Sequence, residues 1–152
     1  MRNIFIFLTV SFSILIVQPI FAKQSKGIEF LNSGTVLPTH LPFSEAVRVD
    51  KTLYLSGQIG ILPGTLTLAP GGIEAESKQT MENIKTSLSA NGYAMSDLVK
   101  CTVLLADMSE WQTFNGIYKT YFSERYPARS AIGANGLALG AKVEVECIAA
   151  VD

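Results

Sequence analysis

The sequence predicts an α+β fold in which one mixed β-sheet carries two helices packed on one of its faces. Two observations lead to this prediction. The hydrophobic pattern has the period of strands, then of a helix, a strand, a second helix and strands again. The chain of 152 residues is long enough for one domain with one modest core. Helices on a single face leave the other face uncovered, and a second copy of the chain is its simplest cover.

The first 22 residues have the pattern of a secretory signal peptide, so we expect the folded domain to span residues 23–152. Arg2 gives a positive start, residues 4–17 form an uncharged apolar run, and Ala22 provides a small residue for cleavage. The run is shorter than the ~20 apolar residues that span a bilayer, so no stable membrane span is expected. We therefore expect export to the periplasm or the outside of the cell, with a cytoplasmic location as the alternative.

The charge balance argues against a nucleic-acid surface. The chain has 12 basic and 13 acidic side chains. Removing the leader takes away one charge, that of Arg2, and leaves 11 basic against 13 acidic side chains, a net charge of −2. A nucleic-acid surface needs a concentrated basic face, which this balance does not favour.

Neither the cysteines nor the histidine predicts a metal site. Cys101 and Cys147 fall in separate predicted strands and His40 stands alone in a loop, so no cluster has metal-ligand spacing. Free cysteine behaves as a small apolar residue, which favours two buried thiols. Export would permit a disulfide if the Cα atoms lay within ~7 Å, and the sequence leaves that open.

The first half of the domain predicts a β-hairpin. Residues 28–31 are an apolar patch, either part of a linker or a short first strand. Residues 41–49 begin as a loop and become a strand, residues 50–51 turn the chain, and residues 52–60 form the partner strand. Gly57 lies inside that strand, where glycine indicates a bulge or a close approach of the backbone to another group.

Residues 73–91 predict the first helix, because Met81, Ile84 and Leu88 lie on one helical face. Gly92 is expected to end this helix.

A strand at residues 98–105 leads to the second helix. Ser109 and Gln112 have the spacing of a capping box, which would start that helix. The helix then presents an aromatic stripe that is more typical of a core than of a ligand site: Trp111, Phe114, Tyr118 and Tyr121. Asn115 lies beside the stripe, where it could reach a partner or be solvated.

The last two predicted strands carry the strongest candidates for binding and catalysis. Residues 126–130 form a proline turn that enters a short strand with Arg129, and residues 142–151 form a terminal strand with Glu144. The two side chains could face each other across a cleft. Arginine would then grip a carboxylate with two parallel hydrogen bonds, and glutamate would hold or deprotonate a water. From the pattern alone, a surface salt bridge is the favoured interpretation.

Four segments in order carry a family resemblance: PFSEAV at 42–47, LSGQI at 55–59, PARS at 127–130 and VEVECIA at 143–149. They resemble the RidA (YjgF/YER057c) family of enamine/imine deaminases. The resemblance implies a chorismate-mutase-like fold and a homotrimer with active sites between subunits. It also implies the hydrolysis of reactive 2-aminoacrylate and 2-imino acids to 2-keto acids and ammonia, without a cofactor.

The resemblance assigns roles to six residues. Arg129 matches the arginine that binds the substrate carboxylate, and Glu144 matches the glutamate that orients the attacking water. Gly57 matches a glycine whose backbone borders the pocket, and Asn115 an asparagine of the same site. The sequence departs from the pattern at two substrate-binding positions, where many members have a tyrosine and a cysteine: Phe43 and Ala131, respectively.

The expected function is therefore a 2-iminobutanoate/2-iminopropanoate deaminase. Glu144 either orients a water or acts as a base, and in the second case partial burial should raise its pKa. One alternative is a non-catalytic module that binds a carboxylate metabolite. Another is an endoribonuclease or translation inhibitor, which the net charge and the leader disfavour.

Overall fold

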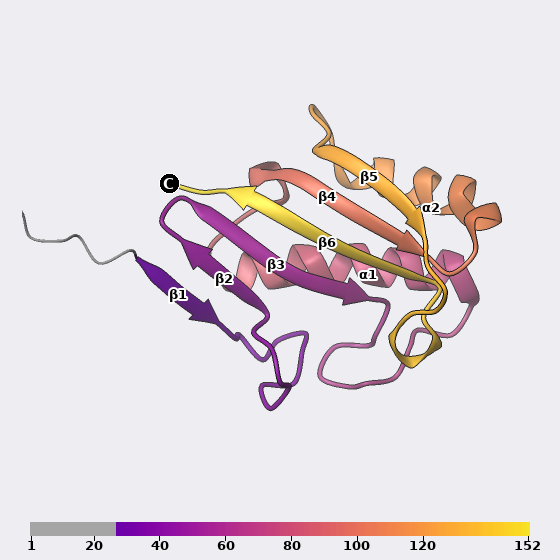
Figure 1. Cartoon of the computed structure of the whole chain (residues 1–152), viewed down its shortest axis with the longest axis horizontal. Coiled ribbons are helices and arrows are strands. Elements are labelled where there is room, and N and C mark those ends of the chain that lie inside the picture. Colours follow the sequence, from indigo (N-terminus) through magenta and orange to yellow (C-terminus); the bar gives the residue numbers. More distant parts are fainter. Residues whose placement is uncertain (1–26) are drawn as a thin grey trace, which may run out of the picture.

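The computed structural model describes residues 27–152, so the predicted signal peptide and its cleavage site lie outside the described residues. Six strands form one sheet in the order β1-β2-β3-β6-β4-β5 (Figure 1). Neighbouring strands are antiparallel except β4 and β5, which are parallel. The strands are β1 (Ile28–Leu31), β2 (Ala46–Val49), β3 (Thr52–Ile59), β4 (Leu98–Leu105), β5 (Ala128–Gly133) and β6 (Val143–Ala150).

Two α-helices, α1 (Gly72–Ala90) and α2 (Trp111–Tyr118), lie behind the sheet in the view of Figure 1, on the same face. Met81 of α1 and Phe114 of α2 are fully buried against Val103 of the sheet in one core. The predicted α+β class, with a mixed sheet and two helices on one face, is confirmed. No helix within residues 27–152 is long and apolar enough to cross a membrane.

A bulge interrupts β3 where the sequence placed Gly57. The pairing of β3 with β6 shifts register between Leu55 and Gln58. A Cβ on Gly57 would overlap the carboxylate of Glu144 on β6. Both predicted explanations of this glycine therefore apply, because the strand is bulged and another group lies against its backbone.

Cys101 and Cys147 form a disulfide, so the prediction of two buried thiols was wrong. The two residues lie directly opposite each other on β4 and β6, with Cα atoms 4.1 Å apart. That distance is well inside the ~7 Å limit for a bridge. The sequence could not reveal the pairing, because the neighbours of β6 depend on contacts between distant parts of the chain.

The capping box predicted for the second helix was also wrong. The Asp107 side chain accepts a hydrogen bond from the backbone N–H of Ser109 at 2.8 Å and caps a short 3₁₀ turn, Met108–Glu110. The turn continues into α2, whose own N-terminus has no side-chain cap. Ser109 therefore uses its N–H as a donor inside the turn, and it does not cap α2.

Candidate active site

The Arg129 side chain is held by α2. Its guanidinium carbon lies 4.6 Å from the centroid of the Trp111 ring and 4.4 Å from that of the Tyr118 ring. Its Nη2 donates a hydrogen bond to Oδ1 of Asn115 at 2.8 Å. Its Nη1 is buried and has no acceptor among the described residues. Nη1 is therefore the guanidinium nitrogen whose capacity to donate to an anion is unused.

The aromatic stripe of α2 has two functions. Phe114 is fully buried in the core, as predicted. Trp111 and Tyr118 also contact the Arg129 guanidinium, so the interpretation of the whole stripe as core was incomplete. Sequence analysis missed these two residues, because their helical spacing is the same for a core stripe and for a pair of rings around a cation.

Glu144 and Gly57 form a second group of predicted site residues. Glu144 is half-buried on β6, and its carboxylate lies where a side chain at position 57 would be. Burial raises the pKa of Glu144 above its ordinary value, and the charge of nearby Glu146 raises it further. Glu144 therefore has the raised pKa that was expected for a general base.

Strand register places these two groups on opposite faces of the sheet. Arg129 pairs with Cys101, which is buried beneath the helices, so the arginine leaves β5 on the helical face. Glu144 alternates along β6 with the buried Val143 and Val145, so it points to the open face. The salt bridge between Arg129 and Glu144 is therefore wrong, and no ion pair found within residues 27–152 involves either residue.

The two positions that depart from the family pattern, Ala131 and Phe43, lie near different groups of site residues. Ala131 lies near Arg129, and Phe43 lies near the bulge at Gly57. Ala131 is exposed on β5 two residues after Arg129, and therefore on the same face of that strand. Phe43 is 49% exposed in the loop before β2. The Oγ of Ser56, next to Gly57, donates to the carbonyl of Ser44 at 2.7 Å. This bond ties the loop of Phe43 to the bulge of β3.

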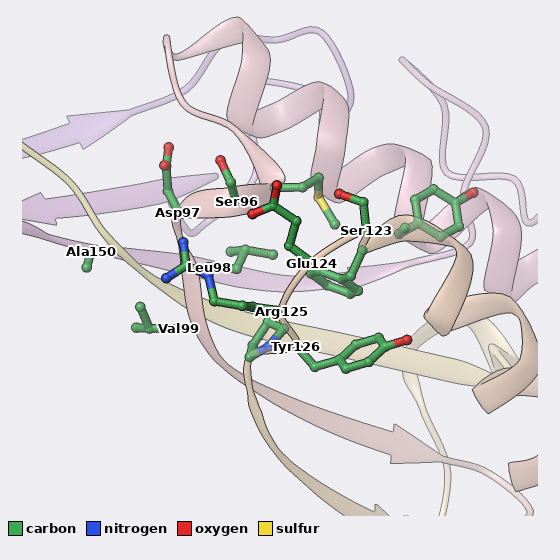
Figure 2. A pocket seen from close by; sticks show the side chains of 13 residues that line it. Ser96, Asp97, Leu98, Val99, Ser123, Glu124, Arg125, Tyr126 and Ala150 are labelled. Carbon is green, nitrogen blue, oxygen red and sulfur yellow. The ribbon is translucent and has the colours of Figure 1, made fainter.

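A cavity of about 280 Å³ adjoins the guanidinium. Its lining residues are Asn115, Tyr118, Lys119, Tyr126, Pro127 and Arg129. A larger cavity of about 630 Å³ also has Tyr126 and Pro127 in its lining. Figure 2 shows this larger cavity, with Tyr126 labelled. It contains none of the six predicted site residues, so its size does not make it the candidate site.

No group of three or more histidine, cysteine or acidic residues within the described part of the chain is arranged to hold a metal ion. The predicted site residues offer a guanidinium beside an amide on one face of the sheet, and a carboxylate with a raised pKa on the other.

Comparison with known proteins gives the family. A family model described as Endoribonuclease L-PSP matches residues 35–151. The 2-iminobutanoate/2-iminopropanoate deaminase of Mus musculus is 48% identical over 127 residues, covering 83% of this chain and 94% of the mouse protein. The human protein of that name is 44% identical over 108 residues, covering 71% and 79%.

Solved structures of similar fold also come from this family. RidA from a Psychrobacter species has a TM-score of 0.76 at 35% identity, with 81% of this chain and 99% of that chain covered. The E. coli protein TdcF, solved with bound serine, has a TM-score of 0.75 at 28% identity, with 82% and 99% covered. The chain therefore belongs to the Endoribonuclease L-PSP family, the RidA (YjgF/YER057c) family that its motifs resemble.

Proposed function

We propose that the protein hydrolyses 2-aminoacrylate and related 2-imino acids to 2-keto acids and ammonia. The observation that carries this proposal is the Arg129 guanidinium, whose buried Nη1 has no acceptor among the described residues while Asn115 holds Nη2. A substrate carboxylate is the natural acceptor for such a group. Relatives named as imine deaminases support the reaction. TdcF with bound serine supports the ligand class, because serine has the carbon skeleton of 2-aminoacrylate.

The proposed reaction uses no cofactor. Arg129 binds the carboxylate, and proton transfer to the terminal carbon of the enamine gives the imine, whose C=N carbon is electrophilic. Glu144 holds a water against that carbon, and the water adds to form a carbinolamine. The C–N bond then breaks, the amine takes up a proton, and the products are a 2-keto acid and ammonia. The raised pKa of Glu144 favours a role in accepting the water proton, beyond orientation alone.

We propose that each active site is shared between two copies of the chain in a homotrimer. Arg129 and Glu144 leave opposite faces of the sheet, so one chain does not bring them together. Arg129 lies on β5, which is an edge strand with exposed residues. The open face of a neighbouring copy could supply Glu144, Gly57 and the loop of Phe43 to that edge.

The test is the decay of imines that an amino-acid oxidase generates from several amino acids, followed with and without the protein. Removing one partner of a desolvated charge pair costs about 2–5 kcal/mol, so Arg129→Ala should lower kcat/KM by roughly 30- to 3000-fold. Arg129→Lys keeps the charge but loses the planar fork, so it should also be badly impaired.

Arg125→Ala is the matched control, because Arg125 lines the larger cavity and does not contact the candidate site. This variant should keep the unmutated rate. Turnover of iminopropanoate by Arg129→Ala at the unmutated rate would contradict the assignment of this site.

Two alternative functions predict other results: neither would accelerate the decay of imines. A carboxylate-binding module would bind serine or pyruvate through Arg129 without accelerating imine decay. An endoribonuclease would cleave RNA, but the net charge of the whole chain is −1 and the candidate site presents one clamped cation beside an amide.

We also propose that the protein is exported and loses residues 1–22. The disulfide between Cys101 and Cys147 supports this proposal, because disulfides persist mainly in oxidising compartments. Intact-mass measurement of the protein from its native host should give a chain that begins at Lys23. A chain that begins at Met1 would contradict the proposal.

A further inference from the structure

We propose that Trp111 and Tyr118 are positioning residues, which hold the Arg129 guanidinium between their rings and set the direction in which it receives a carboxylate. The inference rests on the proposed function, because it concerns how the same guanidinium is presented to substrate.

The spacing of the two rings defines a slot. Trp111 and Tyr118 are seven residues apart on α2, or two turns and about 10 Å along the helix axis. A guanidinium carbon at 4.6 Å from one ring centroid and 4.4 Å from the other lies between them. Both distances fall within the ~6 Å over which a cation is attracted to an aromatic ring.

Asn115 fixes the rotation of the guanidinium within the slot. It lies between the two aromatic residues on the same helical face, and its Oδ1 accepts from Nη2 at 2.8 Å. With Nη2 occupied, the buried Nη1 is the nitrogen left without an acceptor among the described residues. Three side chains of one helix therefore determine the orientation of the cation.

Such a slot matters because Arg129 is long and lies on an edge strand whose other residues are exposed. A free arginine would lose much rotamer freedom on binding substrate. The rings impose that loss before substrate arrives, and they exclude water from the cation, which strengthens its attraction for an anion. Truncating either ring should therefore weaken substrate binding more than it slows the chemical step.

Tyr118 contacts Arg129 through its ring, and its hydroxyl is not needed for that contact. The residue is 2% exposed, and its hydroxyl is buried with no hydrogen-bond partner among the described residues. Burial raises the pKa of this hydroxyl, and the Arg129 charge opposes that rise, as expected for a cation against the ring. Tyr118→Phe should therefore keep the slot, whereas Tyr118→Leu should open it.

The kinetic experiment uses the protein in its native assembly with iminopropanoate as substrate. Tyr118→Leu and Trp111→Leu should each raise KM about 3- to 30-fold while kcat changes less than about twofold. Tyr118→Phe should keep KM within about twofold of the unmutated value. Phe114→Leu is the packing control, since this core ring lies beside both others. It should lower the thermal midpoint without raising KM.

Equal KM values for Tyr118→Leu and the unmutated protein would overturn the inference. A rise in KM for Phe114→Leu as large as that for Tyr118→Leu would overturn it too, because general loosening of α2 would then explain the effect.

A second measurement does not depend on catalysis. The Arg129 side-chain N–H resonance should be shifted upfield by the two rings, and the shift should persist in Tyr118→Phe and shrink in Tyr118→Leu. An unshifted resonance in the unmutated protein would exclude the slot. If the shift is present but Arg129→Ala hydrolyses imine normally, the slot exists and the proposed function fails. If Arg129→Ala is inactive and the ring variants are normal, only the positioning role fails.

Discussion

At the scale of single residues, the charge of Glu146 should tune Glu144. Burial is the larger cause of the raised pKa of Glu144, and Glu146 is the second. A carboxyl group with a raised pKa keeps its proton to a higher pH than an ordinary glutamate. If the ionised form activates water, kcat/KM must fall on the acid side at a pH above the ordinary value of 4.5.

Glu146→Gln should move that acid limb to lower pH, because removing a neighbouring negative charge favours the ionised form of Glu144. The measurement is the pH profile of kcat/KM, corrected for spontaneous hydrolysis. Glu82→Gln, an exposed change on α1, should leave the limb in place. A limb that does not move with Glu146→Gln would show that another group titrates.

The roles of the predicted site residues stay predictions, and the structure shows which of these residues lie together. The motifs selected Arg129, Glu144, Gly57 and Asn115, and the structure brings Arg129 to Asn115 and Glu144 to Gly57. It does not bring the two pairs together. The face of each side chain depends on strand register, which one sequence does not contain for strands far apart in the chain.

At the scale of elements, the bulge of β3 makes room for the Glu144 side chain. Gly57→Ala would place a methyl group where the Glu144 carboxylate now lies. The displaced atoms are the end of a flexible side chain, so the loss of stability should stay below about 1 kcal/mol. Under the proposed mechanism Glu144 holds the water, so displacing its carboxylate should still lower kcat/KM by at least about tenfold.

The control for this variant is Gly116→Ala in α2, where a Cβ would meet no atom within 4 Å. It should keep full activity and gain up to about 1 kcal/mol of stability from higher helix propensity. Chemical denaturation and the imine assay measure both quantities. A fully active Gly57→Ala protein would show that the position of Glu144 is not critical.

Local patterns predicted elements well where they did not depend on distant partners. The alternation at residues 98–105 predicted β4 to the residue, and the apolar face of α1 gave its limits within one residue at each end. The start of α2 was predicted less well, because Asp107 competes with Ser109 as the capping residue. The insertion of β6 between β3 and β4 could not be predicted from local pattern.

At the scale of the whole molecule, the proposed sharing of each site between two copies predicts that two inactive variants restore each other's activity. Arg129→Ala and Glu144→Ala should each be nearly inactive alone. After random exchange of equal amounts of the two variants, about a quarter of all sites should combine an intact Arg129 with an intact Glu144. Recovery of about that share of activity is the expected result. Hybrid assemblies seen by native mass spectrometry without recovered activity would contradict site sharing, as would a monomer in light scattering.

The disulfide should contribute much of the global stability. It joins Cys101 to Cys147 across 46 residues of sequence. For a closed loop of that length, the chain-entropy model gives about 4 kcal/mol. Replacing both cysteines with alanine should therefore lower the thermal midpoint by roughly 10–20 °C. Calorimetry with and without reductant checks this, and an unchanged midpoint would contradict it.

The disulfide also determines how the protein responds to thiol chemistry. The chain has two cysteines in all, and both are consumed by this one buried bond. Residue 131 on β5, at a predicted substrate-binding position, is an alanine. The folded protein therefore offers no sulfhydryl to alkylating agents, to peroxide or to electrophiles released by its own chemistry. Iodoacetamide should leave the cysteines unlabelled and the protein active until the bridge is first reduced in unfolded protein.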